Sequence, residues 1–536
     1  MKKESFYIKK LRIKGKMNQL EKIIIRWIKK IDIRKKWCFV ATFIIGMLCH
    51  GYVFANKISY HDDIVLNGFG LTFGGGRWAL GFLEVCLNKV GGVFSIPWFN
   101  GILSLLFIAL SAIIIVDIFR VKSILGSILI GCILVVYPVT ATAYAYMFNA
   151  WSDFLCLFLN VLAVWIVTKN CYSWYRLICG GGIFCIALGI YQAMFPVGAV
   201  LFLLALILNA VEKKNINIIK DGSRYLGTLM GGMASYLFIT LFLRKISIIE
   251  LTFYNGVNEI GKLELSKLPM KIGVAYIEFF KANFANIHSS IYFAGIIQGI
   301  ILCSFFMFVF LIWKNIYKKM DKILLIILII LLPLGINLIY CFSTQDDFTI
   351  HTLMVYPTVL TLIIPIILMD KINIDDIMHG RKKAFILAES GLISIIVLIV
   401  GVYVYYDNSA YLKATFLQEQ TMAWYNTLIS EIKGTEGYRD EYPVAYIGMY
   451  EAEDRSFAHI PSMENAVRIT GYDLNMQDLV NNYKMYEFMS LRCGYAPELY
   501  KDVEKLKNTE EVKNMEIYPD KGSIKVIDNV VVVKLH

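Results

Sequence analysis

Long apolar runs separated by short polar segments fill the chain from Trp37 onward. A helix needs about 20 mostly apolar residues to cross the roughly 30 Å hydrocarbon core of a bilayer. About eleven runs come close to this length, so the pattern predicts a polytopic α-helical membrane protein. The runs are Trp37–Asn56, Ile96–Phe119, Ile124–Tyr146, Phe154–Thr168, Trp174–Phe195, Val197–Val211, Tyr225–Leu243, Ile291–Trp313, Ile323–Phe342, Leu353–Met369 and Ala384–Tyr406.

Basic residues recur in every second connection between these runs. Cytoplasmic loops carry an excess of Lys and Arg. The basic connections lie near residues 120–122, 169–176, 213–224, 314–322 and 371–383. The intervening short loops, around Asn149, Phe195 and Gln345, carry no Lys or Arg. The alternation predicts a multi-pass protein of the cell membrane, with a cytoplasmic N-terminus and an extracytoplasmic C-terminus.

Residues 1–36 form a basic segment, with 14 Lys and Arg against 3 Asp and Glu. The segment resembles the charged region of a signal peptide, but no small-residue cleavage site follows it. We expect an uncleaved cytoplasmic N-terminal segment in which Leu20–Ile33 forms an amphipathic helix on the anionic inner leaflet. The alternative is a disordered basic arm.

The last 130 residues differ in character from the membrane part, 37–406. Residues 407–536 hold 14 Lys and Arg against 21 Asp and Glu, which favours a separate soluble α/β domain outside the membrane. Within it we expect a helix at Ala410–Ile432 and a strand at Pro443–Met449. A hairpin is expected about Asp528-Asn529, between Gly522–Ile527 and Val530–Leu535.

Composition supports these assignments. The chain has 536 residues, is 57% hydrophobic and 18% charged, and has a mean hydropathy of +0.58, which excludes an ordinary soluble protein. The net charge of +11 is concentrated in the N-terminal segment, so no nucleic-acid partner is expected. Most of the 11 cysteines fall inside apolar runs, which argues against a disulfide framework or a zinc site. The sequence does not predict an oligomeric state.

Two extracytoplasmic loops, 57–95 and 249–290, are unusually long for connections between membrane helices. The first contains Trp78–Val90 and the second Lys271–Phe284, both largely apolar and suited to helices that lie in the outer interface. Simple packing onto the bundle would account for the same pattern.

The leading candidates for a catalytic base are Asp62 and Asp63, just after the first apolar run. A carboxylate beside a second carboxylate and near hydrocarbon tends to have a raised pKa and useful basicity. Neighbouring residues point in different directions, so we expect one of the two to face an acceptor. A solvated turn or helix cap is the alternative.

Asp153 is a further candidate acid at the outer start of the fourth run. An Asp facing lipid is costly, so we expect it to face a polar cavity; with Ser152 it would otherwise cap the helix. Arg77 is the preferred phosphate ligand, because it follows three glycines and a guanidinium can grip phosphate bidentately. Lys281, Arg244 and Lys245 are weaker candidates for the phosphate ligand. The favoured alternative for Arg244 and Lys245 is that they end the seventh run by snorkelling to the interface.

Other polar side chains stand near the outer ends of the runs. His351, which follows a polar loop and precedes Tyr356, would bind phosphate or sugar, or act as an ordinary interface histidine. Tyr191 and Gln192 would line the cavity or pack. No Walker phosphate loop, dinucleotide fingerprint or HExxH motif is present. Without a cytoplasmic nucleotide-binding domain, the donor is expected to be a lipid-linked sugar reached from the outer side.

Taken together, these segments resemble the bacterial glucosyl transferase GtrII family, within the GT-C class of integral-membrane glycosyltransferases. The resemblance spans roughly Trp37 to Tyr406. It rests on His61-Asp62-Asp63, Gly76-Arg77-Trp78, Asn149-Ala150-Trp151-Ser152-Asp153, Gly189-Ile190-Tyr191-Gln192-Ala193 and His351-Thr352-Leu353-Met354-Val355-Tyr356.

The resemblance implies a polyprenyl-phosphate sugar donor, usually of glucose, and inverting transfer on the outer side. We expect the acceptor to be a hydroxyl group of a cell-surface glycan or teichoic-acid-like polymer. The resemblance also implies that Asp62 is the base, Asp63 its companion and Asp153 the acid of the second loop. It implies no metal and no cofactor. Sugar or lipid contacts are expected from His61, Trp78, Asn149, Trp151, Tyr191, Gln192 and Tyr356.

Two other functions remain open from the sequence. A flippase or transporter of a lipid-linked glycan would also have many spans and a polar cavity. It should also show charges deep within several helices and two related halves, which this chain lacks. The second is an oligosaccharide polymerase or ligase that uses a polyprenyl diphosphate donor. The same acidic and basic side chains could serve this enzyme, but the extra phosphate should require a metal ion or additional cationic groups.

Overall fold

The computed structural model describes residues 29, 31–58, 61–64, 68–170, 172–212, 217–248, 250–252, 264–284, 291–316, 318–345, 352–373, 382–450, 463, 472, 477–480 and 482–536. The predicted amphipathic helix at Leu20–Ile33 falls almost entirely outside these residues. His351 also lies outside them.

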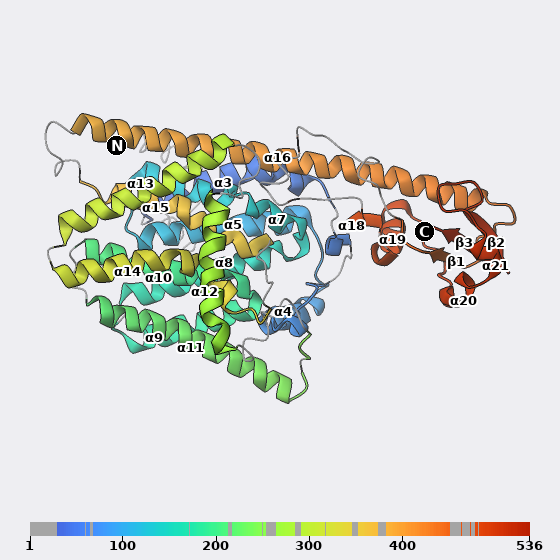
Figure 1. Cartoon of the computed structure of the whole chain (residues 1–536), viewed down its shortest axis with the longest axis horizontal. Helices are drawn as coiled ribbons and strands as arrows, with labels where there is room; N and C mark the ends of the chain where they lie inside the picture. Colours follow the sequence, from blue (N-terminus) through green and yellow to red (C-terminus); the bar gives the residue numbers. More distant parts are fainter. Residues whose placement is uncertain are drawn as a thin grey trace, which may run out of the picture.

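The described chain is largely helical, and most of its helices lie roughly side by side in one elongated bundle (Figure 1). The helices of the bundle and its connections are α3 (Ile33–Ala55), η1 (His61–Ile64), η2 (Phe73–Gly75), α4 (Trp78–Asn88), α5 (Pro97–Ile118), α6 (Ile124–Val136), α7 (Val139–Ala145), α8 (Met147–Lys169), α9 (Trp174–Ile190), η3 (Gln192–Met194), α10 (Phe195–Val211), α11 (Ile218–Lys245), η5 (Leu265–Lys267), α12 (Leu268–Phe284), α13 (Ile291–Asn315), α14 (Lys319–Ile336), η6 (Leu338–Cys341), η7 (Thr352–Val359), α15 (Leu360–Asp370) and α16 (Lys382–Gly434).

Eight helices of the described chain are long and apolar enough to cross a membrane, or nine if the bent pair α6 and α7 is one span. This agrees with a polytopic membrane protein. Every predicted run overlaps a helix, but two fall short of this test. α9 has 17 residues, and α14 carries three charges, Lys319, Asp321 and Lys322, in its first turn. The predicted number of about eleven spans therefore stays a prediction.

The third run is bent by 43° between α6 and α7. Pro138 stands at the break and acts as the N-cap of α7. Proline has no backbone N–H and clashes with the preceding turn, so a helix cannot run straight through it. The apolar content of this run predicted a span, and the proline explains why the span is broken.

One end of the bundle is rich in ion pairs made by the predicted basic connections. Asp117 at the end of α5 lies 2.6 Å from Lys35 and 2.8 Å from Lys169. Lys371, just after α15, lies 2.7 Å from Glu212. α8 leads from Met147 to Lys169 over about 34 Å, the length of 23 helical residues. The segments around Met147 therefore lie at the opposite end of the bundle from these basic residues.

The two predicted interfacial stretches are both helices. Trp78–Val90 corresponds to α4, and Lys271–Phe284 corresponds to α12. α12 packs against α13 and α14 and runs across the direction of the neighbouring helices (Figure 1). Such a direction is expected of a helix that lies along a membrane surface.

α16 is one continuous helix of 53 residues, where the sequence predicted two. It extends along the whole bundle and carries on beyond it (Figure 1). The polar residues at the predicted boundary fit inside the helix because their side chains find partners. Asn408 Nδ2 donates to the carbonyls of Leu48, Cys49 and Val404, at 3.2, 3.0 and 2.8 Å.

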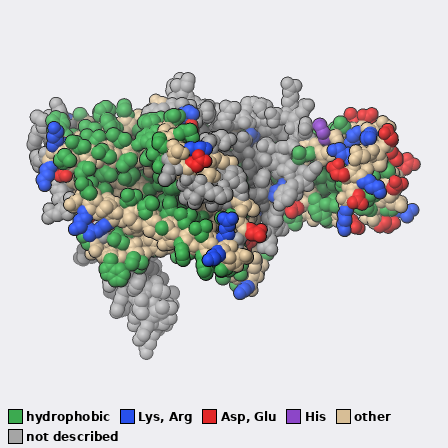
Figure 2. Space-filling view, turned by 60° about the horizontal axis from the view of Figure 1, so that its bottom comes forward, with side chains coloured by type: hydrophobic (Ala, Val, Ile, Leu, Met, Phe, Trp, Pro, Cys, Tyr) green, Lys and Arg blue, Asp and Glu red, His purple; other side chains and the backbone are tan. Residues whose placement is uncertain are grey.

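The residues that follow α16, 435–536, are named here the C-terminal segment. It contains β1 (Val444–Ile447), α18 (Gln477–Val480), α19 (Asn482–Phe488), the π-helix η10 (Met489–Cys493), α20 (Val503–Lys507), α21 (Glu510–Lys513), β2 (Ile524–Ile527) and β3 (Val530–Lys534). The sheet order is β1-β3-β2, with β1 parallel and β2 antiparallel to β3. Charged side chains crowd the surface of this segment, whereas hydrophobic side chains cover much of the bundle (Figure 2).

The predicted hairpin is confirmed in the C-terminal segment. Ile527 pairs with Val530, so Asp528 and Asn529 form a two-residue turn. Both have positive φ, 48° and 63°, as a type I′ turn requires. Asp and Asn tolerate this conformation better than most residues, which is why the pair could be recognised in the sequence.

Candidate active site

A glycine turn before α4 is held by two side chains from distant helices. Gly76 has a φ of 73°, a conformation that glycine adopts without strain. Gln192 Nε2 donates to the carbonyl of Gly75 at 3.0 Å, and the Tyr236 hydroxyl donates to the carbonyl of Gly76 at 3.2 Å. These bonds fix the position of the next residue, Arg77.

The Arg77 side chain is almost buried, with 9% exposed, and it stacks on Tyr191. Its Cζ lies 4.8 Å from the centre of the tyrosine ring. Arg77 Nη1 donates to the carbonyl of Leu71 at 3.4 Å, and its positive charge acts on the carboxylate of Asp153. The structure therefore brings together Arg77, Tyr191, Gln192 and Asp153, four of the residues that the sequence singled out.

Asp153 belongs to a small network within α8. Asn149 Nδ2 donates to both carboxylate oxygens of Asp153, at 3.2 and 3.3 Å. The Ser152 hydroxyl donates to Asn149 Oδ1 at 2.6 Å. Asp153 is the seventh residue of a helix that begins at Met147. The alternative that Ser152 and Asp153 cap this helix is therefore wrong.

Asp63 is fully buried and is held on both sides. Its carboxylate forms an ion pair with Lys57, and Lys57 Nζ also donates to its backbone carbonyl at 3.1 Å. The backbone N–H of Phe148, in the first turn of α8, donates to Asp63 Oδ1 at 3.4 Å. Burial raises the pKa of Asp63, and the positive charge of Lys57 opposes this shift. Asp63 thus caps α8 from outside the helix.

Asp62 and His61 belong to the same short helix, η1. Their backbone is described, but their side chains are not. In the same helix, the Asp63 side chain faces Lys57 and the start of α8. The roles of Asp62 as base and of Asp63 as its companion both stay predictions.

Trp78 and Trp151 take part in packing beside this network. A Cβ atom added at Gly189 would lie 2.8 Å from the Trp78 ring, so glycine at that position allows the indole to pack against α9. The Trp151 ring lies 5.7 Å from that of Phe69, in the loop after η1. Both tryptophans therefore tie the segment between α3 and α5 to the bundle.

Tyr356 and Lys281, two further predicted site residues, make contacts away from Arg77. Tyr356 is fully buried, and its hydroxyl donates to the carbonyl of Leu134 at 2.9 Å. Lys281 lies on α12 with about half of its side chain exposed and forms an ion pair with Glu278 at 2.7 Å. Neither contact joins the network around Arg77.

The sequence did not single out several residues that shape this end of the molecule. Lys57 and Tyr236 were missed, as was a buried lysine on α12. Lys271 Nζ donates to the carbonyls of Ser343 and Gln345, at 2.5 and 2.8 Å, in the polar loop that leads toward His351. The sequence did contain a signal for Lys271, since it is a lysine within a largely apolar stretch and a buried ammonium group needs partners.

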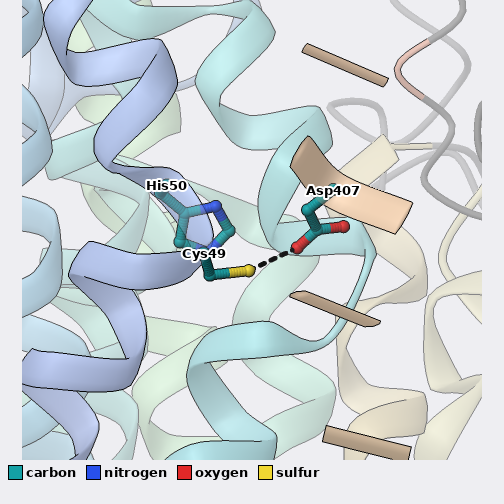
Figure 3. Close-up of side chains that lie close together, drawn as sticks. All are labelled: Cys49, His50 and Asp407. Carbon is teal, nitrogen blue, oxygen red and sulfur yellow. Dashed lines mark hydrogen bonds between the residues drawn. The ribbon is translucent and has the colours of Figure 1, made fainter. Parts of the chain in front are cut away.

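A second polar cluster lies where α3 meets α16. Cys49, His50 and Asp407 are buried there, and the thiol of Cys49 donates to Asp407 Oδ2 at 3.0 Å (Figure 3). The spacing of their ligand atoms would suit a metal ion. However, both ring nitrogens of His50 are already engaged, with the Tyr411 hydroxyl and the carbonyl of Val135, each at 2.8 Å. We therefore regard the cluster as a junction between the two helices.

The network at the end of α8 combines groups suited to sugar phosphate chemistry. A guanidinium group can hold a phosphate through two hydrogen bonds, and a carboxylate can accept a proton from a hydroxyl group. Asp63 meets α8 at Phe148, and Asp153 follows five residues later, about 7.5 Å along the helix axis. Two carboxylates thus lie along the first two turns of one helix, and the Arg77 guanidinium acts electrostatically on the second of them.

The comparisons with known proteins identify the family. The model of the family described as glucosyl transferase GtrII matches residues 51–362, more than half of the chain. The matched region includes η1, the glycine turn and the start of α8. No curated protein and no solved structure matches the chain. The chain therefore belongs to the glucosyl transferase GtrII family and is a glycosyltransferase with the helices of a membrane protein.

Proposed function

We propose that this protein transfers a hexose from a polyprenyl-phosphate donor to a hydroxyl group of a cell-surface glycan or teichoic-acid-like polymer. The family suggests that the hexose is glucose. The reaction takes place on the outer side of the membrane. The observation that carries the proposal is the stacking of Arg77 on Tyr191 beside the Asn149–Asp153 network. This arrangement places an arginine that can bind phosphate beside acidic groups, at the end of the bundle away from the basic connections.

In the proposed reaction, Asp62 takes the proton of the acceptor hydroxyl. The acceptor oxygen attacks the anomeric carbon from the face opposite the phosphate, and the bond from that carbon to the phosphate oxygen breaks. The electron pair leaves with the polyprenyl phosphate, so the configuration is inverted. Arg77 stabilises the charge that develops on the departing phosphate. The role of Asp62 rests on the family resemblance and on the engagement of Asp63 elsewhere.

The neighbouring residues position these groups. Asp63, paired with Lys57, holds η1 against the start of α8, and Asp153 with Asn149 lies beside Arg77. Tyr191 and Gln192 orient Arg77 and its turn. His61, Trp78 and Trp151 are the residues proposed to contact the sugar and the lipid. Lys281, His351 and Tyr356 are kept as candidates for more distant contacts. The proposal needs no metal and no cofactor.

The proposal includes an orientation in the cell membrane. The basic N-terminal segment and the ion pairs around Asp117 and Lys371 lie toward the cytoplasm, where positive residues are enriched. The C-terminal segment then lies outside, on the same side as Asp62. A cysteine-labelling assay with a membrane-impermeant reagent would test this, because a cytoplasmic position for η1 would contradict the mechanism.

The direct test uses purified protein with a polyprenyl-phosphate glucose labelled in both the lipid and the sugar. We predict release of free polyprenyl phosphate that depends on added glycan acceptor. Movement of intact donor between leaflets, without release, would instead identify a flippase. Turnover that requires a polyprenyl diphosphate donor and stops with a chelator would identify a polymerase or ligase.

A further inference from the structure

The C-terminal segment reaches back to the loop that carries the two aspartates. Arg492, in η10, donates from Nη2 to the backbone carbonyl of Lys57 at 2.7 Å. Gln418, on the outer part of α16, donates to the same carbonyl at 3.2 Å. Both donors lie beyond residue 362, where the match to the family ends. A part of the chain outside the family region is therefore bonded directly to the candidate active site.

The residue they hold is the one that pairs with Asp63. The Lys57 ammonium forms its ion pair with the Asp63 carboxylate, and the same carboxylate accepts the N–H of Phe148. A continuous chain of contacts thus leads from Arg492 through Lys57 and Asp63 to the start of α8. Burial lowers the pKa of Arg492, and the nearby negative charge of Asp63 acts in the opposite direction.

Arg492 is itself held firmly. α19, immediately before η10, packs against η1, the helix that contains Asp62. On its other side, Phe488 of α19 stacks on Tyr425 of α16 with ring centres 5.0 Å apart. The Tyr425 hydroxyl donates to the carbonyl of Leu479 at 2.6 Å. The long helix α16 therefore provides a rigid support from which Arg492 reaches the loop.

We propose that Arg492 is a positioning residue of the transfer reaction, which fixes the Lys57–Asp63 pair and thereby the helix that carries Asp62. This proposal rests on the proposed function, because positioning has a meaning only if Asp62 acts in catalysis. It gives the C-terminal segment a role in the active site. Removal of the Arg492 guanidinium should loosen η1 and lower the turnover number, with little effect on donor binding by Arg77.

The experiment compares Arg492→Gln, Arg492→Lys and the control Arg439→Gln in the full-length protein. Arg439 is in the same segment, with an exposed side chain that pairs only weakly with Glu441. Arg492→Gln is expected to reduce kcat about tenfold or more and to change the KM for the donor less than about twofold. Arg492→Lys, which keeps a cationic donor, should recover part of kcat, and Arg439→Gln should leave both values unchanged.

Hydrogen exchange provides a readout that does not depend on activity. The Phe148 N–H lies in the first turn of α8, where it has no partner within the helix, so its protection reports on Asp63. Arg492→Gln should speed exchange in peptides covering 57–64 and 144–149 only. Unchanged exchange there, or faster exchange throughout the bundle, would overturn the proposal. If wild-type protein failed to release polyprenyl phosphate, the proposed function would fail while the exchange result still decided whether Arg492 holds the loop.

Discussion

Lys57 and Asp63 form an ion pair in which the carboxylate is fully buried and the lysine side chain remains 24% exposed. The pair joins three parts of the molecule. These are its own segment between Lys57 and Asp63, η10, where Arg492 donates to the Lys57 carbonyl, and α8, where the Phe148 N–H donates to the Asp63 carboxylate. Removing one partner of a buried pair is costly because the other charge is left uncompensated. The pair therefore makes the position of η1 sensitive to single substitutions.

Replacing Lys57 with Met should alter the pH dependence of activity. The Lys57 charge opposes the upward shift that burial imposes on the pKa of Asp63, so its loss should raise this pKa further. Protonated Asp63 binds the Phe148 N–H less strongly, and the acid limb of kcat should move to higher pH. Because the folded-state pKa lies above the unfolded value, the contribution of Asp63 to stability is present in acid and lost as the pH rises through the folded-state pKa.

The measurement for Lys57→Met is a pH profile of kcat together with melting temperatures at pH 5 and pH 7.5. The variant should lose more stability at pH 7.5 than at pH 5. The control Lys513→Met removes a lysine whose side chain is 54% exposed and should leave both profiles unchanged. An acid limb that does not move in Lys57→Met would contradict the proposed role of the pair.

Arg77→Lys should weaken donor binding even though the charge is kept. Lysine cannot grip a phosphate through two parallel hydrogen bonds, and it would lose the planar stacking on Tyr191. A charge-assisted hydrogen bond contributes about 1.5–3 kcal/mol, which corresponds to an increase of about 10- to 150-fold in the KM for the donor. Arg176→Lys, at the basic end of the bundle, should have no effect. An unchanged KM in Arg77→Lys would remove Arg77 from the phosphate site.

Gly76→Ala should destabilise the turn before Arg77. Gly76 adopts the left-handed conformation, at a φ of 73°, and this conformation raises the free energy of a residue with a Cβ atom by about 1–2 kcal/mol. The matched control is Gly391→Ala in α16, where an added Cβ meets nothing within 4 Å and alanine favours the helix. Thermal unfolding should separate the two variants, and activity should fall only in Gly76→Ala. Equal stability in both would show that the turn tolerates a side chain.

Much of the fold could be predicted because membrane helices follow from a simple physical requirement. Each must bury about 20 apolar residues, so runs such as Ile96–Phe119 and Tyr225–Leu243 coincide with helices α5 and α11. The turn at Asp528-Asn529 was predictable because only a few residues adopt positive φ readily. The continuity of α16 was not predictable, because it depends on partners such as Leu48 for the side chain of Asn408.

The candidate site was predictable only in part. Residue type and position pointed to Arg77, Asp153 and Gln192, since polar groups at the ends of apolar runs are rare and need partners. The pair Lys57–Asp63 could be suspected from neither residue alone. The bond from Arg492 to Lys57 joins residues 435 positions apart, and no local pattern encodes such a contact. Long-range packing brings Asp63 to Lys57 and to the start of α8.

Asp407→Asn should be tolerated, because asparagine keeps an acceptor for the Cys49 thiol and removes an ionisable group from the junction of α3 and α16. In the part of the chain that the structure describes, Asp407 Oδ1 has no hydrogen-bond partner. Thermal unfolding should show an unchanged or higher melting temperature, and metal analysis should give the same content in both proteins. A bound metal lost from Asp407→Asn, with a lower melting temperature, would instead make the cluster a metal site.

Asp62 is the proposed base of sugar transfer from a polyprenyl phosphate. A general base contributes about 10²- to 10⁴-fold to the rate. The decisive measurement is the rate of polyprenyl phosphate release in Asp62→Asn beside wild type and Asp502→Asn, a control at an exposed position with no side-chain cap bond. We predict a loss of at least about 100-fold in Asp62→Asn alone, with normal insertion and melting temperature. Near-normal release in Asp62→Asn would contradict the account.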